Sequence, residues 1–407
     1  MTAPPAPAAL AGLDITEPGF FLRPDYWDAL AWLRAESPVH DLRDGHVLVT
    51  RYDDIRAISR RPHRFSSRHG ALVNDPLRRS GPDDDAGSLL HLDPPRHAEH
   101  RALLNRRFTP RAVEGFDAGI RARTVEVLDA LADEAASGAE VDLVARLAAP
   151  VPVAVIADLL AVPVADRAQF RRWSDAVIDI SDRPDDPAVA TAAAELFAFL
   201  DAHVHDRARA PGDDLVSQLA ASSVGGRGLT HDQVVMFCVT LLVAGNETTR
   251  SLVSGAIEVL AAHPDQRAAL AANRGLTPGA VEESLRWVTP IQAFCRTVTA
   301  PTEVGGTPVE AGAYLVLLYA SGNRDEAAFG PTAGSVDITR PASPAHVAFG
   351  FGEHLCLGAA LARLEARIVL DELLARHPRY VVTGPPIYTP STLTRSIAAL
   401  PVVLAGD

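Results

Sequence analysis

Apolar residues recur at intervals of three and four positions through most of the chain. This spacing predicts amphipathic helices, because side chains three and four apart lie on one face of a helix. The expected helices cover residues 112–135, 163–180, 188–208, 231–262, 278–287 and 358–376. Runs that alternate, or that glycine and proline bound, predict strands over residues 46–52, 294–299, 302–319, 379–383 and 400–404. The pattern therefore predicts a mainly α protein with small β-sheets, an α+β fold.

The length and composition favour one large folded unit. A chain of 407 residues with 47% hydrophobic content can bury a large core. No Ser/Gly-rich linker divides it, and the proline-rich start is typical of a frayed terminus. We expect an N-terminal extension over residues 1–25 and a single domain over residues 26–407.

Charge and cysteine usage exclude several classes of protein. The formal net charge of −13, without a basic stripe, argues against nucleic-acid binding. No signal peptide is visible, and the longest apolar run, residues 234–244, is too short to span a bilayer. The three cysteines are widely spaced, which indicates neither disulfides nor a zinc site. We expect a cytoplasmic protein without a membrane anchor.

One cysteine stands among glycines, directly before a helical pattern, in residues 348–368. Phe349, Gly352 and Gly358 surround Cys356, and glycine lets a backbone turn sharply or approach a flat ligand closely. The free N–H groups at a helix N-terminus stabilise a thiolate. A lone cysteine is more often a small buried apolar residue. The full spacing favours a sulfur that ligates a metal.

Two further segments carry polar residues inside helical patterns. In residues 241–250, Gly245 would permit close approach, and the Thr248 hydroxyl can bond to the carbonyl one turn earlier and open the helix locally. The alternative is a buried helix in which Glu247 is paired and Thr248 merely satisfied. Glu283 and Arg286 lie three apart, a spacing that most often gives a surface ion pair.

Taken together and in this order, the three segments resemble the cytochrome P-450 family of haem-thiolate monooxygenases. The resemblance extends from about Tyr26 to Val403 and implies a single triangular, mainly helical fold holding haem b. It implies Cys356 as the axial ligand of the haem iron and Glu247 and Thr248 as the catalytic acid–alcohol pair. It implies haem contacts from His97, Arg101, Ala244, Gly245, Arg296, Phe349, Gly350, His354 and Gly358.

The resemblance also assigns a structural role and a substrate pocket. Glu283 and Arg286 would form a buried pair behind the cysteine loop. The usual basic residue is replaced by Ser335 and Val336 in "GSVDITR", so either Arg340 substitutes for it or the pair has no third partner. The pocket would be lined by Val243, Ala244, Ile291, Gln292, Phe294, Leu393 and Thr394, with contributions from residues 64–92 and 170–203. Gln292 is the expected uncharged hydrogen-bonding group, and Arg395 the one cation that could meet a carboxylate.

The reaction implied by the family places one oxygen atom from O2 in the substrate and releases the other as water. NAD(P)H would supply electrons through a ferredoxin reductase and a ferredoxin, which could dock on Arg106, Arg107, Arg363 and Arg367. An ordinary solvated face is an equal explanation of these four arginines. The apolar pocket positions favour a neutral lipophilic substrate, such as a sterol, terpenoid, lipid or polyketide-type compound.

Two other functions stay open. An oxidative coupling enzyme or peroxygenase would share the scaffold, although an intact Glu247 and Thr248 argue against the use of peroxide. A non-catalytic haem sensor would need no acid–alcohol pair, which makes it the weaker alternative.

Overall fold

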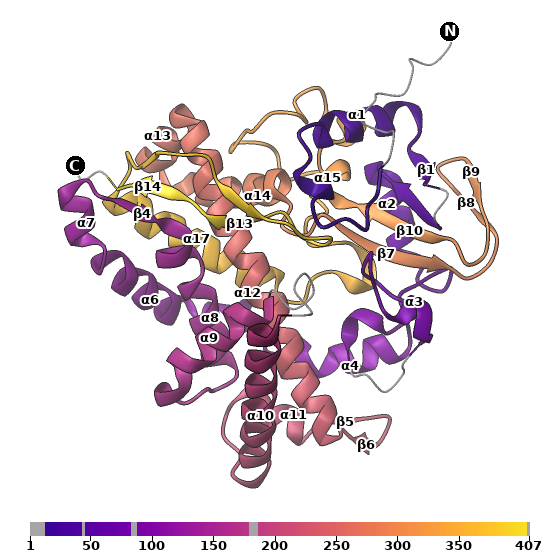
Figure 1. The fold of residues 1–407 in the computed structure, drawn as a ribbon, viewed down its shortest axis with the longest axis horizontal. Coiled ribbons are helices and arrows are strands. Elements are labelled where there is room, and N and C mark those ends of the chain that lie inside the picture. Colours follow the sequence, from indigo (N-terminus) through magenta and orange to yellow (C-terminus); the bar gives the residue numbers. More distant parts are fainter. Residues whose placement is uncertain (1–12, 43–44, 83–87, 179–185, 405–407) are drawn as a thin grey trace.

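The computed structural model in Figure 1 describes residues 13–42, 45–82, 88–178 and 186–404. Helices make up most of it, and a five-stranded sheet lies to one side, near the start of the chain. The helices of four or more residues are α1 (Tyr26–Glu36), α2 (Tyr52–Ser59), α3 (Leu77–Ser80), α4 (Arg96–Asn105), α5 (Pro110–Glu114), α6 (Asp117–Asp129), α7 (Ala132–Ser137), α8 (Pro150–Leu159), α9 (Arg167–Ile178), α10 (Pro187–Arg209), α11 (Leu215–Ala220), α12 (His231–Ala262), α13 (Pro264–Ala272), α14 (Thr277–Val288), α15 (Tyr319–Gly322), α16 (Glu326–Phe329) and α17 (Ala359–Arg376). A π-helical turn, η4, covers Val144–Ala148.

The long helix α12 crosses the middle of the helical part (Figure 1). Thr230 and Gln233 cap its start reciprocally: the Gln233 N–H donates to the Thr230 hydroxyl (3.2 Å), and the Thr230 N–H donates to the Gln233 side chain (3.0 Å). Helices α8, α10, α14 and α17 pack along it. These four helices are therefore positioned by their contacts with one central helix, α12.

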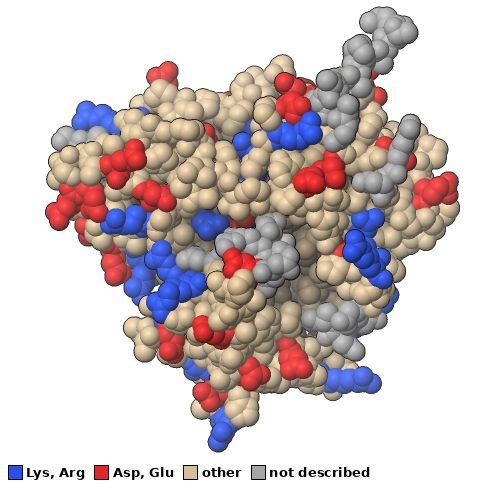
Figure 2. Space-filling view, viewed as in Figure 1, with Lys and Arg blue, Asp and Glu red and all other residues tan. Residues whose placement is uncertain are grey.

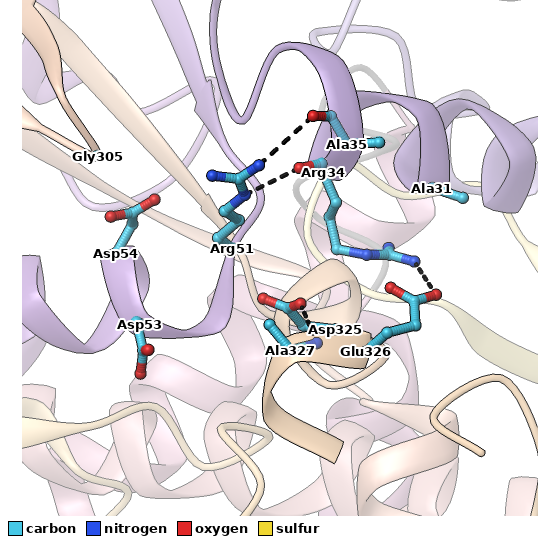
Figure 3. Close-up of a pocket in the computed structure, with 10 residues that line it drawn as sticks. All are labelled: Ala31, Arg34, Ala35, Arg51, Asp53, Asp54, Gly305, Asp325, Glu326 and Ala327. Carbon is cyan, nitrogen blue, oxygen red and sulfur yellow. Dashed lines mark hydrogen bonds and ion pairs between the residues drawn. The ribbon is translucent and has the colours of Figure 1, made fainter. Parts of the chain in front are cut away.

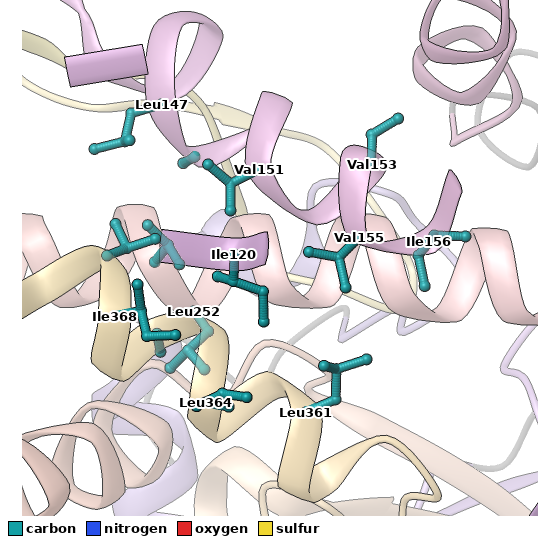
Figure 4. Packing of buried hydrophobic residues seen from close by; sticks show 14 of the residues in the cluster. Ile120, Leu147, Val151, Val153, Val155, Ile156, Leu252, Leu361, Leu364 and Ile368 are labelled. Atoms are coloured by element: carbon teal, nitrogen blue, oxygen red, sulfur yellow. The ribbon is translucent and has the colours of Figure 1, made fainter. Parts of the chain in front are cut away.

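The main core fills the space between α6, α8, α12 and α17. Figure 4 shows branched aliphatic side chains from these four helices interdigitating, among them Ile120, Val155, Leu252, Leu364 and Ile368. All five are at most 7% exposed. Close packing of this kind fixes the separation of α12 and α17, because small changes in core volume are costly.

The largest sheet has the strand order β1 (Val39–Asp41), β2 (His46–Val49), β10 (Tyr314–Leu318), β7 (Ala293–Val298), β3 (Phe65–Ser66). β10 pairs in parallel with β2 and antiparallel with β7. Every residue of β10 is buried, so successive side chains enter two different apolar clusters. The smaller sheets combine β4 (Glu140–Asp142), β5 (Ser223–Val224), β6 (Arg227–Gly228), β8 (Thr302–Val304), β9 (Thr307–Val309), β11 (Val381–Val382), β12 (Ile387–Thr389), β13 (Ser396–Ala399) and β14 (Pro401–Val403).

The predicted α+β fold class is confirmed, and the helix over 231–262 is confirmed at both ends. The single helix over 112–135 is wrong: α5 ends at Glu114, the N–H of the following Gly115 bonds to the Ala112 carbonyl, and α6 and α7 follow separately. Residues 179 and 180, the last two of the helix predicted over 163–180, lie outside the described residues. Before residue 26, Ile15, Phe20 and Phe21 are buried against α1.

Candidate functional site

The cysteine loop is shaped by glycines. Gly350 and Gly352 have φ values of +69° and +74°, which glycine adopts without strain. A Cβ on Gly352 would collide with the Ser59 carbonyl oxygen of α2, so only glycine fits there. The Cys356 N–H donates to the Phe349 carbonyl (2.9 Å) and closes the loop three residues before α17 begins.

The Cys356 side chain is exposed, unlike the buried side chains of Cys238 and Cys295. The neighbour of Cys356, Leu355, is 44% exposed, and Val243 of α12, a helix otherwise largely buried, is 36% exposed. Low solvation in the interior raises the pKa of the Cys356 thiol, and the Gly358 N–H and the Arg101 guanidinium oppose that effect. An exposed thiol next to an exposed leucine fits a large, flat, apolar group with a metal at its centre.

Four basic side chains from three elements gather near this loop. They are His97 and Arg101 of α4, Arg296 of β7 and His354. The rings of His97 and His354 lie 4.2 Å apart, and the Ser67 hydroxyl lies 3.3 Å from His354 Nε2. Burial, together with Arg101 and Arg296, lowers the pKa of His97 to about 4.

The arginines of this basic cluster have no counter-charge at ion-pair distance in the described residues, although the Asp93 carboxylate opposes the lowering of the His97 pKa. Within the described residues, neither Arg101 nor Arg296 has a carboxylate at ion-pair distance, and Arg296 donates only to its neighbour's carbonyl, at Cys295 (2.6 Å). Two unpaired guanidinium groups in a partly buried site fit a ligand with carboxylates. The residues present therefore fit a haem with its two propionates.

On α12, the Thr248 hydroxyl donates to the Ala244 carbonyl one turn earlier (2.6 Å), as predicted. The predicted local opening of the helix is wrong, because α12 is continuous. Gly245 also permits close helix packing: a Cβ there would lie 2.7 Å from Ile156 Cδ1, so the glycine lets α8 pack closely on α12. The Glu247 carboxylate accepts hydrogen bonds from Thr394 and Ser396.

Glu283 and Arg286 form a buried cluster, not a surface pair, and each is at most 3% exposed. Arg286 donates to both carboxylate oxygens of Glu283 (2.8 and 2.7 Å), and its remaining donors meet the carbonyls of Asn323, Ala333 and Ser335. Arg340 supplies the third partner, since its Nε lies 3.0 Å from Glu283 Oε2. The missing basic residue is thus replaced by one that follows later in the chain.

The residues expected around the substrate divide into two groups. Ile291, Phe294 and Leu393 are half-buried and present apolar surface. Gln292 is fully buried: its amide donates to the Thr289 carbonyl (2.5 Å) and accepts from the Tyr26 hydroxyl (3.0 Å). The expectation that Gln292 hydrogen-bonds a substrate is therefore wrong. The described parts of 64–92 and 170–203 leave out residues 83–87 and 179–185.

The side chains of the adjacent residues Arg395 and Thr394 point to different parts of the molecule. The Arg395 guanidinium stacks on Tyr388 (4.2 Å to the ring centroid) and shares a cavity of about 30 Å³ with Glu258 and Arg324. Glu258 lies ten residues beyond Thr248 on α12, about 15 Å along the axis. The expectation that Arg395 could meet a substrate carboxylate is corrected by this position.

Three of the four arginines proposed for partner docking are in ion pairs. Arg107 contacts Asp213 (2.8 Å), Arg363 contacts Glu282 (2.6 Å) and Arg367 contacts Asp117 (3.3 Å). Figure 2 shows basic and acidic side chains intermixed over one face of the molecule, without a continuous basic stripe on that face. Charge alone does not mark a docking surface on these arginines.

A separate open pocket of about 590 Å³ lies between α1, α2 and α16 (Figure 3). Several of its charged groups have partners: Arg34 contacts Glu326 (3.3 Å), Arg51 donates to the Arg34 carbonyl (2.9 Å), and Asp325 accepts from the Ala327 N–H (3.0 Å). Asp53 and Asp54 of α2 also line this open surface groove.

Among the described residues, α10 alone has the length and apolar composition of a membrane span, with a mean hydropathy of 1.2 and a third of that window buried. This is weak support for a span, because core helices of other proteins meet the same measure.

The fold and the cysteine loop define a haem-thiolate protein. A family model described as Cytochrome P450 matches residues 190–380. The chain is 38% identical over 407 residues to Cytochrome P450 monooxygenase PikC of Streptomyces venezuelae, covering 96% of this chain and 94% of that protein. It is 35% identical over 398 residues to Steroid C26-monooxygenase of Mycobacterium tuberculosis, covering 96% of each.

A solved structure of CYP109E1 from Bacillus megaterium in complex with testosterone is also similar. Its TM-score is 0.81 and its identity 32%, with 93% of this chain and 99% of that chain covered. The chain belongs to the cytochrome P450 family. It is a P450 monooxygenase, and the family implies the haem-thiolate cofactor for which the site residues fit.

Proposed function

We propose that this protein binds haem b through Cys356 and hydroxylates or epoxidises a neutral, lipophilic small molecule. The observation that carries the proposal is the accessible thiol of Cys356 beside a basic cluster whose arginines have no counter-charge at ion-pair distance in the described residues. His97, Arg101, Arg296 and His354 would hold the propionates. Ala244, Gly245, Phe349, Gly350 and Gly358 would lie against the ring. When bound, the haem supplies O2 activation, which a thiolate ligand favours.

The residues of α12 would manage protons and exclude water. The Thr248 hydroxyl, held by the Ala244 carbonyl, presents one oxygen at the middle of the helix. Glu247 is the neighbouring acid and can take up and release a proton. Positioned acid–base groups of this kind lower the barrier to proton transfer.

The substrate class follows from the apolar surface of the pocket. Val243, Ala244, Ile291, Phe294 and Leu393 offer no charge, and burying a charged ligand against them would be costly. With the Gln292 amide and the Thr394 hydroxyl engaged within the protein, hydrophobic contact would provide most of the affinity. One similar protein is named for a steroid, and a solved relative holds testosterone, which supports sterol-like or lipid substrates.

The electron donors would be a ferredoxin and an NAD(P)H-dependent ferredoxin reductase, working in the cytoplasm. Arg106 is exposed and would be the leading contact on the cysteine side, since Arg107, Arg363 and Arg367 already hold carboxylates. A docking acidic partner would compete with those pairs.

The carbon monoxide complex of the reduced protein tests the ligand. It should give the long-wavelength Soret band of thiolate ligation, and Cys356→Ala should abolish it. Cys238→Ala, which removes a buried free cysteine elsewhere on α12, should keep the band. A normal spectrum from Cys356→Ala would refute the assignment.

Spectral titration tests the substrate class. Neutral steroids and branched lipids should shift the haem toward high spin, whereas matched carboxylic acids should bind more weakly. High-spin shifts with charged compounds alone would contradict the proposal.

A further inference from the structure

The carboxylate of Glu247 is held on one side only. Its Oε1 accepts from the Thr394 hydroxyl (2.8 Å) and from the Ser396 hydroxyl (3.1 Å). No described residue bonds Oε2. Thr394 and Ser396 are at most 1% exposed, so water does not replace these donors easily.

A third hydroxyl stands behind the first two. The Ser251 oxygen, one turn after Glu247 on α12, lies 2.5 Å from the Ser396 oxygen. Each hydroxyl has a single hydrogen to donate. Because Ser396 gives its hydrogen to Glu247, Ser251 must donate to Ser396. Ser251 therefore donates to Ser396, and both Ser396 and Thr394 donate to Glu247 Oε1.

Two backbone contacts set the position of Thr394. Ile291 and Thr394 form an isolated antiparallel bridge, and the Gln292 N–H donates to the Leu393 carbonyl (2.9 Å). The Ser391 hydroxyl accepts from the Thr394 N–H (3.2 Å). Alternation along the strand then places Thr394 and Ser396 beside Glu247, whereas Arg395 lies on the other face, beside Glu258 further along α12.

We infer that Thr394, Ser396 and Ser251 are positioning residues that fix Glu247 for proton delivery and reserve Oε2 for the exchanged proton. Oε1 can accept hydrogen bonds whether or not Oε2 carries a proton, so the three hydroxyls keep their own protons. One proton enters and leaves at Oε2, and nothing else changes. The inference rests on the proposed role of Glu247.

The first experiment compares peroxide formed per NAD(P)H consumed. Glu247→Gln should raise this ratio, and Thr394→Val, which keeps the shape but loses the hydroxyl, should raise it about threefold to tenfold. Thr394→Ser should restore it. In the Glu247→Gln background, Thr394→Val should add nothing, because both changes act through one group.

Ser254 provides the matched control for Ser251. It lies on the same helix, is equally buried and bonds only to backbone carbonyls, with the Arg250 oxygen at 2.8 Å. Ser251→Ala should raise the peroxide ratio, whereas Ser254→Ala should leave it unchanged. Equal effects of the two changes would overturn the inference.

A spectroscopic readout separates positioning from activity. The stretching band of carbon monoxide on the reduced haem reports nearby charge. In Thr394→Val it should broaden or split as Glu247 takes up a second position, and Thr394→Ser should narrow it again. An unchanged band would overturn the inference.

The outcomes distinguish a failure of the proposed role of Glu247 from a failure of the positioning inference. If Glu247→Gln does not alter the peroxide ratio, the proposed role of Glu247 fails, and the inference fails with it. If Glu247→Gln raises the ratio but Thr394→Val and Ser396→Ala do not, only the positioning inference is overturned. An additive effect of Thr394→Val on Glu247→Gln would also overturn it.

Discussion

Two groups of buried basic side chains differ in how their charge is balanced. Around Arg286, every donor meets the Glu283 carboxylate or a backbone carbonyl, and Arg340 completes the set. Around Arg296, guanidinium and imidazole groups face one another without a carboxylate at ion-pair distance in the described residues. The first group is therefore a structural cluster in which every donor of Arg286 has a partner.

In the second group, burial and the neighbouring arginines lower the pKa of both histidines and so favour their neutral forms. The cluster therefore carries less charge than its composition suggests. A dianionic ligand would reverse this balance. Internal charge balance, more than burial, therefore separates a structural cluster from a binding site.

The largest expected effect is on the balanced cluster. Glu283→Ala would leave two guanidinium groups without their carboxylate and should lower the free energy of unfolding by about 3–5 kcal/mol. Denaturant unfolding of the holoprotein would measure it. The adjacent Glu282, a half-exposed partner of Arg363, is the matched control, and Glu282→Ala should cost about 1 kcal/mol or less. Equal losses of unfolding free energy in the two variants would mean that the Glu283 cluster is not a buried structural cluster.

The unbalanced cluster should respond in the opposite sense. Arg101→Gln with Arg296→Gln should weaken haem binding about tenfold to a hundredfold, because charge-assisted hydrogen bonds to the propionates are lost. The apoprotein should be no less stable, since repulsion among the basic groups is relieved. Haem titration and urea unfolding of the apoprotein test the two halves separately. A destabilised apoprotein would refute the comparison.

The smallest expected effect is a pH dependence of the apoprotein. The pKa of His97 is about 4 when folded, against about 6.5 in an unfolded chain. The unfolded state therefore binds the proton first, and stability falls as the pH drops from 6.5 toward 4. The loss should be about 1 kcal/mol at pH 5.5. His97→Gln should remove that part of the slope, whereas a change at the exposed His205 should not. Identical slopes in the wild type and His97→Gln would argue against it.

Local patterns predicted α12 well because its signals are local: a cap at Thr230, uninterrupted apolar periodicity, and proline at 264 just beyond its end. They missed α8, since "PVPVAVIADL" is apolar nearly throughout and has no polar face to reveal a period. Helix α5 was merged with α6 because Gly115 does not by itself mark a helix end.

The site was predictable where a motif fixes the chemistry and unpredictable where tertiary contacts decide it. The spacing around Cys356 indicated the loop before its shape was known. Nothing in the sequence revealed that Gln292 would satisfy its amide inside the core, or that Thr394 would turn toward Glu247. Thr394 and Glu247 lie 147 positions apart in the sequence, and no local pattern predicts a contact between residues so far apart.

The bridge between Ile291 and Thr394 has a consequence for laboratory evolution. Ile291 and Leu393 are natural positions at which to enlarge a pocket for a new substrate, yet they share a backbone with the donor that holds Glu247. Selection for substrate range at these two positions will therefore also select against efficient use of reducing equivalents. Lineages that gain a new substrate should recover efficiency through later changes on α12, and the order of those mutations would record the linkage.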